Sequence, residues 1–326
     1  MSLEQVRLPQ EGGGVFLTDG GIETTLIFHE GWELPYFAAF DLLKSAEGTR
    51  ALSRYYARYA ALARASGLGF VLESPTWRAS RDWGDKLGYG AAALADANGK
   101  AIRLMGELRQ AFAGGASAMV ISGCVGPRGD GYDPGSSMAA EEAADYHAAQ
   151  IASFAANAAD MVTAITMTNA SEAIGIAHAA QVAGLPVALS FTVETDGRLP
   201  TGQSLAEAIA EVDDATGAAP RYYMINCAHP EHFASVLAPG AAWVQRIRGL
   251  RANASRRSHA ELNEAPDLDA GDPSELGAQY RALRAQHPQL TVLGGCCGTD
   301  HRHLQAICEA CGWESDASLT CRPEVA

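Results

Sequence analysis

Eight short apolar runs alternate with helix-forming stretches, and this alternation constrains the fold more than any other feature of the chain. Several of the runs are rich in Val and Ile, which is typical of strands buried on both faces of a parallel sheet. The runs lie at residues 15–18, 70–73, 118–122, 161–167, 186–193, 222–227, 243–247 and 290–293. The helical stretches are expected at residues 51–65, 90–112, 139–158, 171–183, 205–214, 230–237, 273–286 and 301–310.

Eight strand–helix units favour a closed (β/α)8 barrel over an open doubly wound sheet. The length of 326 residues fits one such barrel with extensions, and no Pro/Ser-rich linker divides the chain. We therefore expect a single domain over residues 1–326, with the barrel core at 15–312. The longest irregular stretch, 251–273, follows the seventh run and is interpreted as an active-site lid.

Charge and hydropathy exclude several classes of partner. The net charge of −14 argues against a nucleic-acid-binding surface, and the basic cluster at 246–257 is interpreted as an active-site loop or solvated surface. No run of 18 apolar residues predicts a membrane span, and residues 1–14 contain no apolar signal core. These features favour a cytoplasmic location, in which the seven cysteines stay reduced. The sequence does not predict an oligomeric state.

Three cysteines stand at the ends of two of the predicted strands. Cys296 and Cys297 lie between glycines directly after the last run, and Cys227 ends the run at 222–227. The carboxyl ends of barrel strands line one face, so we expect these thiols to converge. Three thiolates form a zinc site with one open position, which is typical of a catalytic site. The alternative is that the cysteines are buried apolar fillers.

An open position on a thiolate-bound zinc suggests sulfur chemistry. A substrate thiol bound there would be held as a thiolate at neutral pH, because the metal lowers its pKa. Such a thiolate is a nucleophile toward a methyl group on a sulfonium or quaternary nitrogen. Four further residues, Asp19, Glu73, Cys124 and Thr166, stand at or near other predicted strand ends and are expected at the same mouth.

Four motifs, in order along residues 15–312, carry a resemblance to a known family. They are Thr18-Asp19-Gly20-Gly21, Gly123-Cys124-Val125-Gly126-Pro127, Ile225-Asn226-Cys227 and Gly294-Gly295-Cys296-Cys297-Gly298-Thr299. With them the sequence resembles the homocysteine S-methyltransferase family. The resemblance implies a (β/α)8 barrel with Zn2+ on Cys227, Cys296 and Cys297. It also implies methyl transfer from a small onium donor to a thiol acceptor, usually homocysteine, to give methionine.

The same resemblance implies roles for residues around the metal. Asp19 would contact the amino group of the acceptor, and Asn226 would help to orient it. The backbone amides of Gly20, Gly21 and Ile22 would receive its carboxylate, as N–H-rich loops do for anions. An ordinary strand-to-helix turn is the alternative interpretation of Asp19-Gly20-Gly21.

One position departs from the family pattern. Members commonly carry Glu-Thr at the end of the fourth strand, whereas Ile165 precedes Thr166 here. An ammonium facing Ile165 would lose a charge-assisted partner, at a cost of about 1.5–3 kcal/mol. Glu73 could substitute from across the mouth; otherwise the acceptor is not a standard amino-acid thiol. The alternative interpretation of Glu73 is a helix-start or surface carboxylate.

The donor is not determined by the motifs. A barrel without a corrinoid or folate domain suggests S-methylmethionine, S-adenosylmethionine, a betaine or a dimethylsulfonio compound. Aromatic faces often hold onium groups, and Trp77 is the candidate contact, with packing as the alternative. The same alternatives apply to Trp32, Tyr36 and Phe40.

Two other classes of protein compete with a thiol methyltransferase. One is a zinc hydrolase or lyase using metal-bound water, which three soft ligands make less suitable. The other is a zinc-binding barrel that has lost catalysis. His301 and His303 are interpreted as polar helix-start residues, and Cys308 and Cys311 as packing residues rather than a second metal site.

Overall fold

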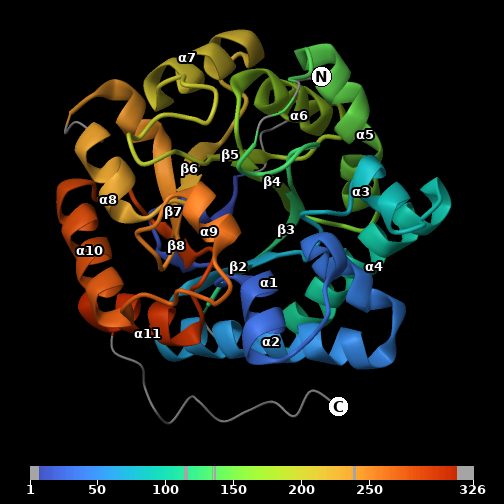
Figure 1. Cartoon of the computed structure of the whole chain (residues 1–326), viewed down its shortest axis with the longest axis horizontal. Coiled ribbons are helices and arrows are strands. Elements are labelled where there is room, and N and C mark those ends of the chain that lie inside the picture. Colours follow the sequence, from blue (N-terminus) through green and yellow to red (C-terminus); the bar gives the residue numbers. More distant parts are fainter. Residues whose placement is uncertain (1–6, 114–116, 134, 136, 238–239, 314–326) are drawn as a thin grey trace.

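A computed structural model describes residues 7–113, 117–133, 135, 137–237 and 240–313, so Cys321 and residues 1–6 lie outside the described part. Its centre is a closed barrel of eight parallel strands (Figure 1). Each strand pairs with the next in sequence, and β8 pairs with β1. This confirms the predicted (β/α)8 architecture. The strands are β1 (Phe16–Leu17), β2 (Gly69–Glu73), β3 (Met119–Val125), β4 (Met161–Met167), β5 (Val187–Phe191), β6 (Tyr222–Asn226), β7 (Ile247–Ala252) and β8 (Val292–Gly295).

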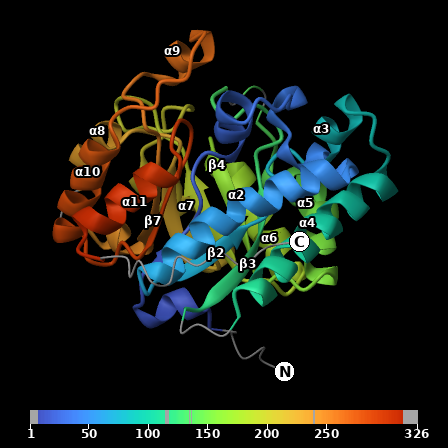
Figure 2. The same ribbon diagram turned by 90° about the horizontal axis from the view of Figure 1, so that it is seen from below.

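Helices surround this barrel, and short helices lie in the loops (Figures 1 and 2). The outer helices are α2 (Ala46–Ala65), α4 (Ala91–Ala111), α5 (Ala140–Ala156), α6 (Ala170–Val182), α7 (Leu205–Thr216), α8 (Pro230–Phe233), α10 (Pro273–Gln286) and α11 (His301–Ala310). The loop helices are α1 (Ile22–Thr24), α3 (Arg81–Lys86) and α9 (His259–Glu264). Figure 2 places α9 at one end of the barrel, among the loops that follow the strands.

Local sequence explains where several helices begin and end. Ser204 and Glu207 form a capping box at the start of α7, and Gly217 ends that helix with φ of 64°. Asp272 caps α10, whose first residue is Pro273, the position at which proline is tolerated. These signals stand in the sequence itself, which is why the predicted and observed helices agree closely there.

The end of the barrel opposite α9 is filled by the segment before β1. The 3-10 helix Pro9–Gly12 lies there, with Leu8 in a buried cluster that includes Phe16 and Tyr222. Gln10 Nε2 donates to the hydroxyl of Tyr222 at 3.3 Å. Arg221 pairs with Glu11 at 2.7 Å. This end of the barrel is therefore packed, and the cavity lies at the opposite end, at the carboxyl ends of the strands.

The prediction of a seventh strand at 243–247 is wrong. Residues Ala242–Arg246 form a 3-10 helix, and β7 runs from Ile247 to Ala252. Trp243 and Val244 resemble a strand because both pack against the core. The true strand contains Arg248 and Arg251 and so has the composition of a polar loop. The segment 251–273 is correspondingly not one irregular loop, because it begins in β7 and contains α9.

Within the described part of the chain, no helix is both long enough and apolar enough to cross a membrane.

Candidate active site

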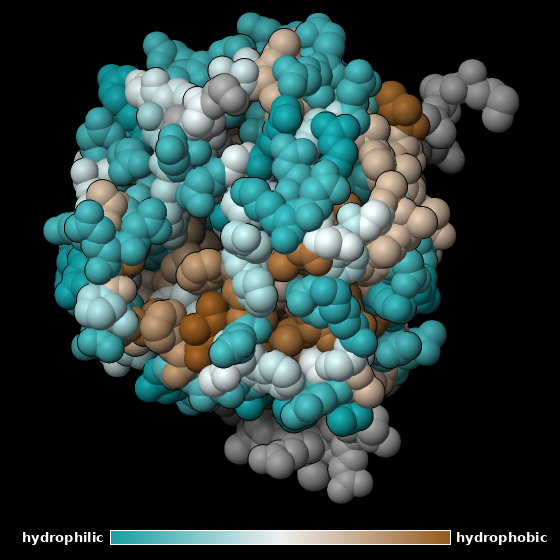
Figure 3. Space-filling model, turned by 45° about the vertical axis from the view of Figure 1, so that its right-hand side comes forward, coloured by the Kyte–Doolittle hydropathy of each residue, from teal (hydrophilic) through white to brown (hydrophobic). Residues whose placement is uncertain are grey.

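A cavity of about 160 Å³ lies at the carboxyl ends of the strands. Its lining comes from loops and strand ends distributed around the barrel, including Asp19, Glu73, Cys124, Thr166 and Cys227. The prediction that these strand-end residues share one mouth is confirmed. The space-filling view shows hydrophobic residues gathered within a largely hydrophilic face of the molecule (Figure 3).

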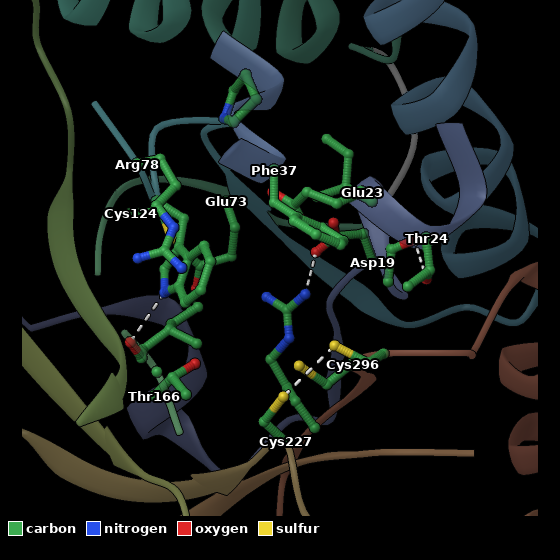
Figure 4. Close-up of a pocket in the computed structure, with 18 of the residues that line it drawn as sticks. Asp19, Glu23, Thr24, Phe37, Glu73, Arg78, Cys124, Thr166, Cys227 and Cys296 are labelled. Atoms are coloured by element: carbon green, nitrogen blue, oxygen red, sulfur yellow. Dashed lines mark hydrogen bonds and ion pairs between the residues drawn. The ribbon is translucent and has the colours of Figure 1, made fainter. Parts of the chain in front are cut away.

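Three thiols converge in this cavity, as predicted. The Sγ atoms of Cys227, Cys296 and Cys297 all lie within 4.8 Å of one another, and Cys227 and Cys297 are 3.5 Å apart (Figure 4). A tetrahedral zinc with Zn–S bonds of about 2.3 Å separates two sulfurs by about 3.8 Å. The sulfur spacing and the soft donor set therefore fit zinc with one further ligand.

The backbone presents these thiols through unusual conformations. Cys227 has φ of 57°, which turns its side chain at the end of β6. Gly298 has φ of 79° and allows the chain to reverse after Cys297. Gly294 and Gly295 belong to β8 rather than to the turn. Hydrogen bonds from Cys227 and Cys297 hold the pKa of the Cys296 thiol well below its usual value, and the charge of Arg251 adds to this effect.

Tyr132 contacts two of the three thiols and was not predicted from the sequence. Its hydroxyl lies 3.1 Å from Cys227 Sγ and 3.5 Å from Cys297 Sγ. Its ring stacks on His259 of α9, with centroids 4.0 Å apart and planes at 13°. The β3–α5 loop carries Tyr132, and no spacing in the sequence indicates that this loop folds back onto strands β6 and β8.

A buried ion pair between Asp19 and Arg251 lies beside the thiols. Asp19 Oδ1 accepts from Arg251 Nη2 at 2.7 Å, and Oδ2 accepts from the Tyr55 hydroxyl at 3.0 Å. Arg251 Nε donates to the Gly295 carbonyl, and Nη1 has no hydrogen-bond partner among the described residues. Burial raises the pKa of Asp19, although the charge of Arg251 opposes the shift. Arg251 was placed only in the basic cluster 246–257, interpreted as an active-site loop or solvated surface, and its pairing with Asp19 was missed because β7 was placed too early in the sequence.

Two further carboxyls line the cavity. Burial raises the pKa of Glu73, at the end of β2, to about 7, against the opposing charge of Arg251. Its Oε2 atom has no hydrogen-bond partner in the described structure. Burial also raises the pKa of Glu23 to about 8. Glu23 follows the Asp19-Gly20-Gly21 motif closely, and this proximity is the one sequence signal that could have indicated Glu23 as a cavity residue.

Asn226 ties the ends of three strands together beneath the thiols. Its side-chain oxygen accepts from Thr166 N at 2.9 Å and from Ser190 Oγ at 2.6 Å. Its Nδ2 donates to Thr166 Oγ1 at 2.8 Å and lies 3.8 Å from Cys296 Sγ. Ile165 lines the cavity, and its carbonyl accepts from Trp77 Nε1 at 3.2 Å. Trp77 itself lines the cavity, with the Arg78 guanidinium 4.1 Å from its ring centroid.

The Gly20-Gly21-Ile22 turn also lines the cavity. A Cβ atom on Gly21 would lie 2.6 Å from the Cys296 carbonyl oxygen, so this close approach requires glycine. The Gly21 amide donates to the Thr299 carbonyl at 3.0 Å. That hydrogen bond links the first motif to the last, and it engages one of the three amides expected to face a substrate.

Other residues singled out from the sequence lie elsewhere. Phe40 is fully buried in the core, and Trp32 packs against the core. The ring centroids of Tyr36 and Trp83 are 6.0 Å apart. Phe37 lines the cavity instead. His301 and His303 begin α11, where Asp300 and His303 form a capping box. Among the described residues, the three-cysteine group is the one cluster of three or more His, Cys, Asp or Glu residues that could hold a metal, and it does not include Cys308 or Cys311.

A closed (β/α)8 barrel with three thiols at the carboxyl ends of its strands defines a class of barrel enzyme built for sulfur chemistry. The family model described as homocysteine S-methyltransferase matches residues 16–311. The chain belongs to this family and is an S-methyltransferase.

Solved structures of a homocysteine methyltransferase, MmuM from Escherichia coli, share this fold. The metallated form is 19% identical with a TM-score of 0.71, over 90% of this chain and 95% of that chain. The oxidized form is 21% identical with a TM-score of 0.68, over 90% and 94%. The apo form is 20% identical with a TM-score of 0.66, over 94% and 100%. No curated protein matches the chain.

Proposed function

We propose that this enzyme transfers a methyl group from a small sulfonium or quaternary-ammonium donor to a zinc-bound thiol, with homocysteine as the acceptor and methionine as the product. The convergence of three Sγ atoms within 4.8 Å in a member of this family carries the proposal. Bound zinc would hold the acceptor sulfur as a thiolate and so supply the nucleophile. We take the barrel core at 15–312 as the functional unit, and its reduced thiols fit the cytoplasm.

The protein residues hold and orient the reactants. Cys227, Cys296 and Cys297 would hold the zinc, and Asn226 supports them through its contacts with Thr166 and Cys296. The Arg78 guanidinium lies over one face of the Trp77 indole, so an onium donor would make its cation–π contact with the opposite face. The donor methyl must lie in line with the acceptor sulfur, at about 3–3.5 Å, for displacement without a covalent enzyme intermediate.

The head group of the acceptor needs partners of both charges. Asp19 is engaged by Arg251 and Tyr55, so it would contact an amino group only through its remaining acceptor capacity. Glu73 offers an unpartnered oxygen for the ammonium, and Arg251 Nη1 offers an unpartnered donor for the carboxylate. The amides of Gly20 and Ile22 add to the carboxylate site.

A second candidate is methyl transfer to a thiol that lacks an ammonium group. Ile165 places an apolar side chain in the cavity, and the pairing of Asp19 with Arg251 leaves Asp19 without a free charge. A thiol carboxylate would avoid an unpaired ammonium and would still find Arg251 Nη1.

Two acceptors of equal chain length distinguish these candidates. Homocysteine and 4-mercaptobutanoate share the thiol and the carboxylate, and only homocysteine carries an ammonium. Each is assayed with S-methylmethionine, glycine betaine and S-adenosylmethionine, with metal content measured on the same samples. We expect about one zinc per chain and methionine formation with one donor. Faster methylation of 4-mercaptobutanoate would favour the second candidate.

The same samples test the competing classes of protein. Zinc without methylation of any thiol would favour an inactive zinc-binding barrel. Ester or amide hydrolysis would favour metal-bound water as the nucleophile. Chains that bind no metal would contradict the proposal outright.

A further inference from the structure

We propose that the hydroxyl of Tyr132 occupies the fourth ligand position of the three-cysteine site in the resting enzyme, and that the acceptor thiol displaces it. The inference rests on the proposed metal site and concerns its regulation. Tyr132 belongs to none of the motifs that carry the family resemblance.

The distances carry this inference. In a tetrahedral zinc site with Zn–S of about 2.3 Å and Zn–O of about 2.0 Å, the oxygen lies about 3.5 Å from each sulfur. The Tyr132 hydroxyl lies 3.1 Å from Cys227 Sγ and 3.5 Å from Cys297 Sγ. It therefore lies at nearly the separation that a fourth ligand takes from two of the three sulfurs, Cys227 and Cys297, on the side of the site where an acceptor sulfur would have to bind.

The ring of Tyr132 is held in this position by stacking on a hydrogen-bonded neighbour. It stacks on His259, and His259 Nε2 lies 2.7 Å from the carbonyl oxygen of Cys227, one of the three cysteines. His259 Nδ1 lies 3.1 Å from Glu194, which fixes the other edge of the imidazole. His259 thus contacts both the Tyr132 ring and the Cys227 backbone, so the hydroxyl keeps its place beside Cys227 and Cys297 without a bound substrate.

The loop before Tyr132 is anchored to the barrel mouth on the other side. Arg78 donates to the Gly129 carbonyl at 2.9 Å and pairs with Asp130 at 3.2 Å. Asp130 in turn accepts from the Tyr132 amide at 2.9 Å. These are polar contacts at a loop with no regular hydrogen-bond ladder, and such segments open more readily than strands. Displacement of the phenol therefore requires movement of a loop and leaves the barrel intact.

Occupation of the fourth position has a measurable consequence. An acceptor thiol binds only the fraction of molecules in which the position is open, so its apparent dissociation constant equals the intrinsic constant divided by that fraction. Occupation in nine molecules of ten would weaken thiol binding about tenfold. The phenol would also keep other ligands away from the metal until an acceptor arrives.

The test is a thiol titration of the cobalt-substituted enzyme, followed through sulfur-to-cobalt charge-transfer absorption. The probe is 2-mercaptoethanol, which has no ammonium or carboxylate and so does not depend on the head-group contacts. Tyr132→Phe keeps the stacked ring and removes only the hydroxyl. We expect this variant to bind the thiol about tenfold more tightly than the wild type.

Tyr89→Phe is the matched control. Its hydroxyl donates to Asp41 at 2.9 Å, and Tyr89 does not line the cavity, so its loss should leave thiol affinity unchanged. A gain in affinity is a readout that damage to the fold does not produce. Equal or weaker thiol binding by Tyr132→Phe would overturn the inference and leave the proposed function standing. A wild type that binds no cobalt or zinc would overturn both.

Discussion

Arg251 is the residue on which the charge balance of the mouth depends. It neutralises Asp19 at 2.7 Å in a site where both side chains are less than a tenth exposed. The charges of Asp19 and Glu73 outweigh the effect of burial and hold the pKa of Arg251 above its usual value. Because a buried charge is tolerated only with a partner, each member of this group constrains the others.

Arg251→Met should destabilise the protein strongly, because it leaves Asp19 buried without its cation. We expect a loss of about 3–5 kcal/mol, measured by urea unfolding. Adding Asp19→Asn to the same chain removes the stranded charge and should restore much of the loss. A double variant less stable than Arg251→Met would contradict the pairing as described.

Glu73 should make stability depend on pH. Burial raises its folded-state pKa from 4.5 to about 7, so the folded protein retains a proton that the unfolded chain releases. The contribution to stability is fully present below pH 4.5 and is lost as pH rises through about 7, with a total on the order of 3 kcal/mol. Glu73→Gln should reduce the slope of the unfolding free energy across this window, and Glu23, whose pKa burial raises to about 8, should maintain the remainder. Glu107→Gln, at an exposed position in α4, should leave the slope unchanged.

At the scale of the element, a glycine in α6 determines how closely α6 can pack against α5. A Cβ atom on Gly175 of α6 would lie 2.6 Å from the Ala140 carbonyl oxygen and from the Ala144 amide nitrogen of α5. The two helices can therefore pack in contact only if residue 175 has no side chain. Because α6 follows β4 directly, its position also influences the strand end that carries Ile165 and Thr166.

A pair of glycine substitutions tests this packing. Gly175→Ala should lower the free energy of unfolding by about 1–3 kcal/mol, because backbone atoms of α5 would have to move. Gly106→Ala in α4 meets no atom within 4 Å and should stabilise the protein by about 1 kcal/mol through helix propensity alone. Thermal and urea unfolding measure both. Stabilisation of both variants would show that propensity, not close approach, controls position 175.

At the scale of the whole molecule, the proposed zinc joins strands that are distant in sequence. Cys227 follows β6, and Cys296 and Cys297 follow β8 on the far side of β7. A metal bound to all three would therefore link β6 and β8 across the intervening strand β7. A ligand that binds only the folded state stabilises it in proportion to the logarithm of its concentration over its dissociation constant.

Removal of the metal by a chelator should accordingly lower Tm, and zinc should restore it. Replacing any one of the three cysteines by alanine should abolish this response together with metal content and activity. Cys308→Ala, at a buried position in α11 outside the cavity, should keep the metal response even if its own Tm is lower. Full metal content in a Cys227→Ala chain would contradict the site as drawn.

The sequence by itself was sufficient for the barrel, because the period of apolar runs and the helix caps are local signals. It was also sufficient to bring the three cysteines together, because parallel strands of a barrel end on one face. The position of β7 was not predictable in this way. Arg251 of this strand is buried with Asp19, 232 residues earlier in the chain, as its opposite charge.

Only the tertiary structure decided what surrounds the thiols. Tyr132 and His259 come from loops after β3 and β7, whose paths depend on contacts across the barrel mouth rather than on any repeat in their own residues. The pairing of Asp19 with Arg251 and the unpartnered atoms of Glu73 and Arg251 have the same origin. Strand periodicity is a property of neighbouring residues, whereas the charge and shape of a cavity arise from residues that meet only when the barrel closes.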